Sequence, residues 1–407
     1  MPSATVERGS RAELSTVDGD LSAVGPCRIR APGDETLRVT GTMELVGEVA
    51  FDSPVECRDL RVREGRLLVV GSLTVRDDLE ADEARVDVEG ALSAQRIEVD
   101  QNLKVAGALR ATRIEVGGEL HAQRNLHAES VTVGSRLEVE ELLEARLVES
   151  GGSLKAHEVR VENLEAGGSA EVGGGAVREK IEVGAAFLCR SEFEFGSLEA
   201  GGPVDLGASS KGRRLEAAGS LRVAGDLEFE RLQVGGAVEI RGIVRGESME
   251  VGGPVSVGRS LHLSGRLEVG GPLTVREELG VREMEIGGTL SARSAILSGD
   301  AEVAGSVQTE RGFKARTIEL GRRSSAVGPL IADRIELGRK CRAEDLYGRN
   351  IELEERCQAG RIFGASVTLG EGSYAEQVQY TEALRTDPSV TLRHPAERVP
   401  ALPPFPL

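Results

Sequence analysis

A short alternation of apolar and polar residues recurs along most of the chain. Between residues 90 and 155 the unit apolar-x-apolar begins at positions spaced by 5, 6 and 6 residues, so that three steps make 17 residues. The alternation places two side chains on one face of a strand and the polar middle side chain on the other. Helical spacing is absent, so the pattern predicts three short strands per 17 residues. The rows in phase are Leu92, Leu109, Leu126 and Leu143; Ile97, Ile114, Val131 and Val148; and Leu103, Leu120, Leu137 and Leu154.

The same period returns in the second half of the chain. One row there holds Leu267, Met284, Ala301, Ile318 and Ile335 at intervals of 17, followed by Ile351 and Val367 at intervals of 16. Gly-Gly and Gly-Pro pairs stand between many of the strands, and glycine tolerates the positive φ of tight corners. Three strands and three corners close one triangular coil, and stacked coils pair in parallel. The sequence therefore predicts an all-β fold, a parallel, right-handed, triangular β-helix with about 17 residues per coil.

The regularity of the period divides the chain into segments. The 17-residue spacing of the apolar anchors is irregular near the N-terminus and around a Phe-bearing stretch in the middle. It is also lost in a Pro-containing C-terminal stretch, where proline removes backbone donors. We expect residues 1–12 to be disordered, 13–64 to form irregular N-terminal coils or a cap, 65–183 to form the first β-helix half, 184–220 an irregular joint, 221–376 the second half, and 377–407 an exposed tail.

Composition and charge fit this fold and exclude several classes of ligand. The 407 residues include 52 Gly, only 8 Phe and 3 Tyr, and no Trp. A narrow coil lined by small aliphatic side chains accounts for this bias, and sites that stack on bases or flat rings usually need more aromatics. The net charge of −17 argues against nucleic-acid binding, which needs a basic face.

Cysteines and terminal segments bear on compartment. The cysteines are few, odd in number and widely spaced, which suits free thiols in a reducing cytoplasm; they are Cys27, Cys57, Cys189, Cys341 and Cys357. Cys341 and Cys357 fall at anchor positions one coil apart, so we expect them to stack inside the core. The start of the chain lacks the apolar region of a secretory signal, and no apolar run reaches the length of a membrane span. We therefore expect a cytoplasmic protein.

One predicted outward row is acidic. Stacked about 5 Å apart, its carboxylates would form either a stripe that binds cations or partners or a solvated face balanced by nearby arginines. A flat row of single glutamates is a poor cage for calcium. The histidines, by contrast, sit at unrelated positions, so we expect no metal site and no cofactor. The acidic ladder holds Glu268, Glu285, Glu302, Glu319 and Glu336, with Glu250 and Glu352 continuing it.

Aromatic residues gather near the C-terminal coils. Phe363, Tyr374 and Tyr380 lie where a solenoid must be capped or paired, because its end exposes strand edges and core. These residues are candidates for an end-to-end assembly surface, and simple capping is the alternative. No GxSxG, HExxH or P-loop motif occurs, so the chain is expected not to be an enzyme.

Several runs are similar to the bactofilins, a family of polymer-forming cytoskeletal proteins of bacteria and archaea. The similar runs are Val303 to Val307, Leu330 to Leu337 and Val367 to Gly372, which look like the family's V-x-G-x-I-x-A-x-x-V-x-I-x-x-G pattern. The resemblance extends over roughly residues 65–375, although a bactofilin core is far shorter. It implies a right-handed triangular β-helix, nucleotide-independent filament assembly through the ends, a scaffolding role and no catalysis.

These observations lead to a structural interpretation. We expect a scaffold or cytoskeletal protein that associates with itself through its ends, binds no nucleic acid and has no membrane span. The alternative is a non-polymerising β-helical adaptor that binds protein partners through its faces or its Pro-rich tail. A solenoid enzyme, such as a carbohydrate-modifying hydrolase or an acyltransferase, is the remaining alternative.

Overall fold

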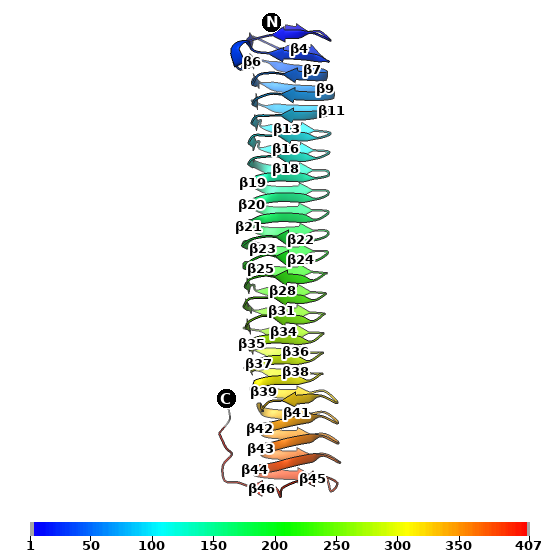
Figure 1. Cartoon of the computed structure of the whole chain (residues 1–407), viewed down its shortest axis with the longest axis vertical. Coiled ribbons are helices and arrows are strands. Elements are labelled where there is room, and N and C mark those ends of the chain that lie inside the picture. The colour runs from blue at the N-terminus through cyan, green and yellow to red at the C-terminus, as the bar shows by residue number, and fades with distance from the viewer. Residues whose placement is uncertain (1–3, 405–407) are drawn as a thin grey trace. The chain divides into compact units, whose positions relative to one another are not determined.

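The computed structural model describes residues 4–404, which form two compact units, 1–202 and 203–407. Each unit is a stack of coils built from short parallel strands (Figure 1). In the described part of the chain the only helical element is a 3₁₀ turn, η1, at Pro32–Asp34. None of the described helical segments could span a bilayer.

The first unit contains strands β1 to β23. They are β1 Ala4–Val6, β2 Arg11–Glu13, β3 Thr16–Val17, β4 Leu21–Val24, β5 Cys27–Arg30, β6 Leu37–Val39, β7 Thr42–Phe51, β8 Val55–Cys57, β9 Asp59–Val69, β10 Leu73–Val75, β11 Asp78–Val88, β12 Leu92–Ser93, β13 Arg96–Val99, β14 Leu103–Val105, β15 Leu109–Arg110, β16 Arg113–Val116, β17 Leu120–Ala122, β18 Leu126–Val133, β19 Leu137–Ser150, β20 Leu154–Ala166, β21 Ala170–Val183, β22 Phe187–Cys189 and β23 Phe193–Ala200.

The second unit contains strands β24 to β46. They are β24 Val204–Leu206, β25 Ser210–Ala217, β26 Leu221–Val223, β27 Leu227–Glu228, β28 Arg231–Val234, β29 Val238–Ile240, β30 Val244–Gly246, β31 Ser248–Val251, β32 Val255–Val257, β33 Leu261–Leu263, β34 Arg266–Val269, β35 Leu273–Val281, β36 Glu283–Ile286, β37 Leu290–Leu297, β38 Asp300–Val303, β39 Val307–Leu320, β40 Ser325–Val327, β41 Leu330–Leu337, β42 Arg342–Leu353, β43 Gln358–Leu369, β44 Tyr374–Thr386, β45 Thr391–Leu392 and β46 Glu397–Arg398.

The predicted register is confirmed by the strand pairing. Leu92 pairs with Leu109, Ile97 with Ile114, and Leu103 with Leu120, so the three rows form three parallel ladders around each coil. In the second unit the row from Leu267 continues coil by coil to Val367. The fold is a parallel β-solenoid of about 23 turns with about 17 residues per coil, as the sequence predicts.

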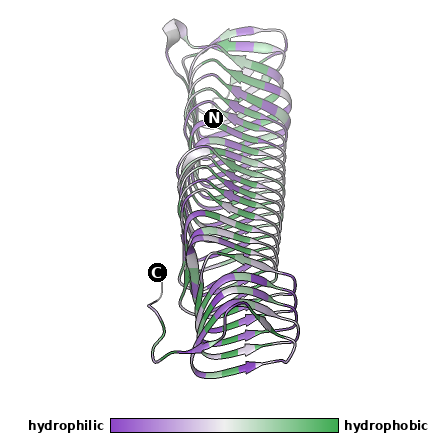
Figure 2. Cartoon of the chain, turned by 60° about the horizontal axis from the view of Figure 1, so that its bottom comes forward, coloured by the Kyte–Doolittle hydropathy of each residue, from purple (hydrophilic) through white to green (hydrophobic). Residues whose placement is uncertain are grey.

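Hydrophobic and hydrophilic residues alternate along the strands (Figure 2), and the inward ones form a buried, mostly aliphatic core. Anchor residues such as Leu92, Ile97 and Ile318 are 0% exposed. Outward side chains commonly form ion pairs between neighbouring coils, for example Lys155 Nζ with Glu138 at 3.0 Å. Such exposed pairs add little stability singly. The aliphatic stack therefore supplies most of the stability, and the charges keep the outer face polar.

Corner glycines serve close stacking at one edge of the first unit. A Cβ on Gly134 would lie 2.2 Å from the carbonyl oxygen of Gly117, and one on Gly151 would lie 2.3 Å from that of Gly134. Neither Gly134 nor Gly151 has a positive φ. The sequence argument assigned corner glycines to positive φ, whereas at these corners the absent side chain lets one backbone rest on the next.

The coils at the N-terminus vary in length, which explains why no clean phase is visible there. From Ala4, successive coils along one ladder advance by 17, 22, 17, 19 and 18 residues. The longest of these coils accommodates η1 as an insertion between β5 and β6. An insertion at a corner shifts the sequence phase without breaking the ladder, because pairing depends on the strands alone.

The structure corrects both predicted ends. We expected disorder over 1–12, but β1 and β2 pair with β4 and β5, and Val6 lies in the core; residues 1–3 lie outside the described chain. We expected a tail from residue 377, but β44 continues the ladder to Thr386 with Val378 fully buried, and β45 and β46 pair with it. Both errors arose because neighbouring strands hold these segments although their own apolar pattern is sparse. The joint predicted over 184–220 stays a prediction.

Candidate functional site

The aromatic residues predicted for the assembly surface lie in different environments. Phe363 is an outward residue of β43, and its ring stacks on Tyr347 of β42 with centroids 4.8 Å apart and planes 18° apart. Tyr374 starts β44 opposite Thr391, and Tyr380 pairs with Gly364 and Arg398. Both of these tyrosines are half-buried. The structure thus brings Phe363 together with Tyr347, a residue that the sequence argument missed.

Phe363 belongs to an outward apolar row that we call the aromatic row, formed by Ile331, Tyr347 and Phe363. These residues pair directly on β41, β42 and β43. They are only 3%, 7% and 7% exposed, and Leu402 packs against them. The sequence held a signal for this row, because large apolar residues stand at the middle position of the strand unit on three consecutive coils, where a polar residue is more usual.

The acidic ladder forms in the predicted register. Glu268, Glu285, Glu302, Glu319 and Glu336 pair in turn on five strands, β34, β36, β38, β39 and β41. All of them except Glu268 line a concavity of about 480 Å³ on the outer face.

Arginines neutralise the two ends of this ladder. Arg266 contacts Glu268 at 3.2 Å and Glu285 at 2.6 Å, and Arg334 forms an ion pair with Glu336. Burial, and then the carboxylates of Glu336 and Glu302, raise the pKa of Glu319. At Glu319 the charged carboxylate is therefore disfavoured first by burial and then by its two neighbours in the ladder.

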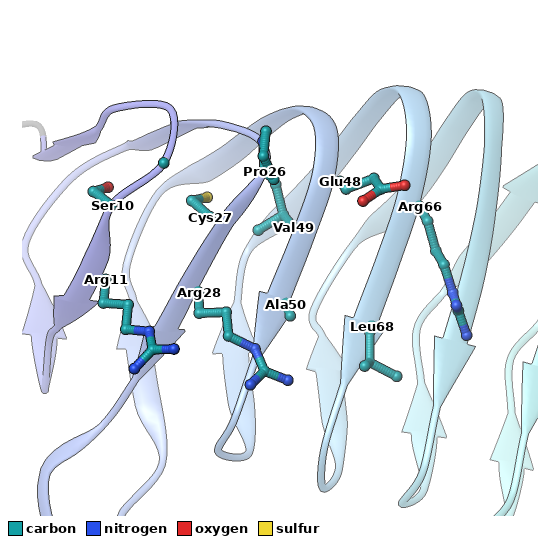
Figure 3. Close-up of a pocket in the computed structure, with 11 residues that line it drawn as sticks. Ser10, Arg11, Pro26, Cys27, Arg28, Glu48, Val49, Ala50, Arg66 and Leu68 are labelled. Carbon is teal, nitrogen blue, oxygen red and sulfur yellow. The ribbon is translucent and has the colours of Figure 1, made fainter.

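A second concavity, of about 450 Å³, lies on the outer face of the first unit. Arg11 and Arg28 are register partners on β2 and β5, and their side chains extend in parallel beside Ala50 and Leu68 (Figure 3). Arg28 reaches Asp52 at 3.6 Å, whereas Arg11 forms no ion pair with any residue of the described chain. Two parallel guanidinium groups are suited to holding a carboxylate or a phosphate.

The cysteines are buried as expected. All five are free and lie in the core. Burial raises the pKa of Cys57 to about 12 and that of Cys189 to about 11. The thiols of Cys341 and Cys357, one coil apart, donate to the carbonyl oxygens of Gly321 at 2.9 Å and Gly338 at 3.1 Å. The interaction between the two neighbouring thiols lowers the pKa of Cys341 to about 7 and raises that of Cys357.

Histidines occupy the surface and pair with carboxylates singly. His121 Nε2 lies 3.0 Å from Glu140, and His127 Nδ1 lies 3.2 Å from Glu144. Within residues 4–404, no three histidine, cysteine or acidic side chains are grouped closely enough to hold a metal ion.

The outer edge of the first coil is open in the described chain. Strands β1, β2 and β3 each pair on one side only, with β4, β5 and β6. The Ala4 N–H donates to Asp20 O at 3.0 Å, and the Leu14 N–H donates to Arg30 O at 2.9 Å. Because successive peptide groups of a strand point to opposite sides, the N–H groups of Thr5 and Glu13 point toward the open edge.

Comparison of the chain with models of known families, with curated proteins and with solved structures found no match in any of the three.

Proposed function

We propose that the protein is a structural scaffold that associates with itself through the ends of its solenoid, without nucleotide. The observation that carries this proposal is the open edge of β1, β2 and β3, whose outward N–H groups are free to pair with another strand. An unpaired strand edge is a template for a second chain. Bactofilins, which the sequence resembles, assemble in this manner, and membership of that family is part of the proposal.

The side faces support association through ends. Charged residues and ion pairs between coils cover most of the outward rows, as with Arg61 and Glu80 at 3.3 Å. Like-charged faces discourage lateral packing of two solenoids. Pairing at an open edge is made by main-chain hydrogen bonds, which do not require any particular side-chain charge. An edge-to-edge contact would therefore add copies along the stacking direction of the coils.

The test removes only the outward donors. In the double variant Thr5→Pro/Glu13→Pro, the outward N–H groups are lost, while the bonds that Ala4 and Leu14 make to the next coil remain. The matched control is Thr5→Val/Glu13→Val, which keeps both N–H groups. We expect nucleotide-free filaments or oligomers of the wild type and the control in negative-stain electron microscopy and light scattering, and single copies of the proline variant.

Two outcomes would contradict the proposal. A wild-type protein that stays a single copy at every concentration would favour the adaptor interpretation, in which the faces bind other proteins. Filaments that persist in the proline variant, with its circular dichroism unchanged, would show that this edge is not the contact.

A further inference from the structure

The aromatic row is an outward row of the second unit that is covered. Its neighbours in the same row are Lys314, which is exposed, and Ile296, which is 55% exposed. Ile331, Tyr347 and Phe363 point outward in the same way, yet they are nearly as inaccessible as the core. Because the strands are the same on both sides of this boundary, the cover must come from elsewhere in the chain.

The cover is the C-terminal segment, residues 399–404. After β46 the chain turns back along the outside of β42 to β44 (Figure 1), and Leu402 packs on the aromatic row. The Val399 N–H donates to Tyr380 O at 2.8 Å, which anchors the start of the segment on β44. Val399, Leu402 and Pro403 are half-buried, whereas Pro400, Ala401 and Pro404 are exposed.

The length and composition of this segment fit the span that it crosses. Extended polyproline-type chain rises about 3.1 Å per residue, so the three steps from Val399 to Leu402 cover about 9 Å. That is about two coil spacings of ~4.8 Å, the distance from β44 to β42. Pro400, Pro403 and Pro404 have no N–H to satisfy, so the segment can cross the strands without joining their ladder.

We propose that the aromatic row is a docking site for an extended proline-rich segment, which the chain's own residues 399–404 fill in cis and the same segment of a second copy fills in trans. Stacked rings beside an aliphatic side chain are the surface that proline-rich peptides bind in other recognition domains. Among the described residues, the side chain that packs on the row in cis is that of Leu402, on a tether that starts at Val399. A short tether gives the cis segment an effective concentration of about mM, so a segment in trans competes when copies are held together at a similar concentration. The inference stands whether or not the protein polymerises.

The first experiment opens the site in the full chain and offers it the segment as a peptide. The variant Leu402→Asp releases the segment without changing any strand. A fluorescently labelled peptide of residues 396–404 is titrated into this variant and into the wild type, and its anisotropy is measured. We expect saturable binding to Leu402→Asp and at least ~10-fold weaker apparent binding to the wild type, where the cis segment competes.

Matched substitutions locate the site. On the Leu402→Asp background, Phe363→Gln should abolish peptide binding, whereas Ile296→Gln, a change at an uncovered position of the same row, should leave it unaltered. Glutamine is the residue that follows Phe363 in this row, at Gln379, so the fold should persist, and circular dichroism of each variant checks this. A peptide carrying Leu402→Asp should not bind.

Three results would overturn the proposal. One is no saturable binding of the peptide to Leu402→Asp up to about 1 mM, where the cis effective concentration lies. Another is equal binding to the wild type and to Leu402→Asp. The third is binding that survives Phe363→Gln in a folded chain.

Discussion

Two outward rows of the second unit, the aromatic row and the acidic ladder, stand on the same kind of strand and differ in what lies over them. The aromatic row is covered by Leu402 and is at most 7% exposed, whereas the acidic ladder faces solvent, with arginines at its ends. Each row occupies the middle position of an apolar-x-apolar unit, Leu330 to Ala332 for Ile331 and Ile335 to Leu337 for Glu336. The strand period therefore decides that a residue points outward, and the path of the rest of the chain decides whether that residue is exposed to solvent.

The largest difference in stability should appear between a substitution at an inward residue and a substitution at the outward residue next to it in the chain. Ile318 is 0% exposed and is the chain neighbour of Glu319 in the ladder. Ile318→Ala should lower the free energy of unfolding by about 2–5 kcal/mol, because the cavity in a tightly stacked core cannot collapse. Glu319→Ala should cost less than about 0.5 kcal/mol. Urea unfolding, with hydrogen exchange over β38 to β41, measures both, and similar losses for the two variants would contradict the inward–outward distinction.

A smaller effect should separate the covered from the uncovered part of one outward row. Phe363→Gln removes a buried ring that contacts Tyr347 and the C-terminal segment, so we expect a loss of about 1–3 kcal/mol. Ile296→Gln changes an exposed side chain and should alter stability by no more than about 0.5 kcal/mol. Thermal unfolding of both variants makes the comparison, and equal shifts in Tm would mean that coverage contributes nothing.

The smallest effect should come from the middle of the acidic ladder and should depend on pH. The raised pKa of Glu319 means that the folded state disfavours its charged form relative to the unfolded chain. This penalty is absent below the ordinary glutamate pKa and complete above the raised one, so it should fade as the pH is lowered from 7 toward 4. Glu319→Gln should stabilise the protein at pH 7 by a few tenths of a kcal/mol, the scale of an exposed pair of like charges, and by nothing at pH 4.

Urea titrations of the wild type and Glu319→Gln at pH 7 and pH 4 test this sign. Glu250→Gln provides the matched control, because Glu250 stands in the same row but has the neutral Gln233 on one side and Glu268 on the other. A wild type that is more stable than Glu319→Gln at pH 7 would show that the ladder is stabilised by cations or by its arginines.

Much of the fold could be predicted because each coil repeats the same alternation of apolar and polar residues. The row from Leu92 to Leu143 and the row from Leu267 to Val367 both have the register that the spacing predicts. The acidic ladder also followed, since it is tied to the anchors by one residue. The 22-residue coil around η1 was not predicted. An insertion at a corner lengthens the spacing between anchor residues, and the inserted residues show no apolar pattern of their own.

The candidate site was predicted only in part. The sequence groups Phe363 with Tyr374 and Tyr380 as candidates for one assembly surface, because the three are close in sequence. The ring that contacts it is Tyr347, one coil earlier in the stack. Proximity in a solenoid is set by the coil period, so a residue 16 positions away is a closer neighbour than one 11 positions away.

The sequence by itself determined the strand period, the parallel register and the side on which each residue lies, because alternation is a local property of the chain. Only the tertiary structure decided which outward residues are covered, that the first coil has an open edge, and that Leu402 reaches the aromatic row. These features depend on which segments of the chain meet in space, and the 17-residue period does not specify those contacts. The C-terminal segment follows none of the ladders, and its place is fixed by one backbone hydrogen bond at Val399 and by the apolar surface that it covers.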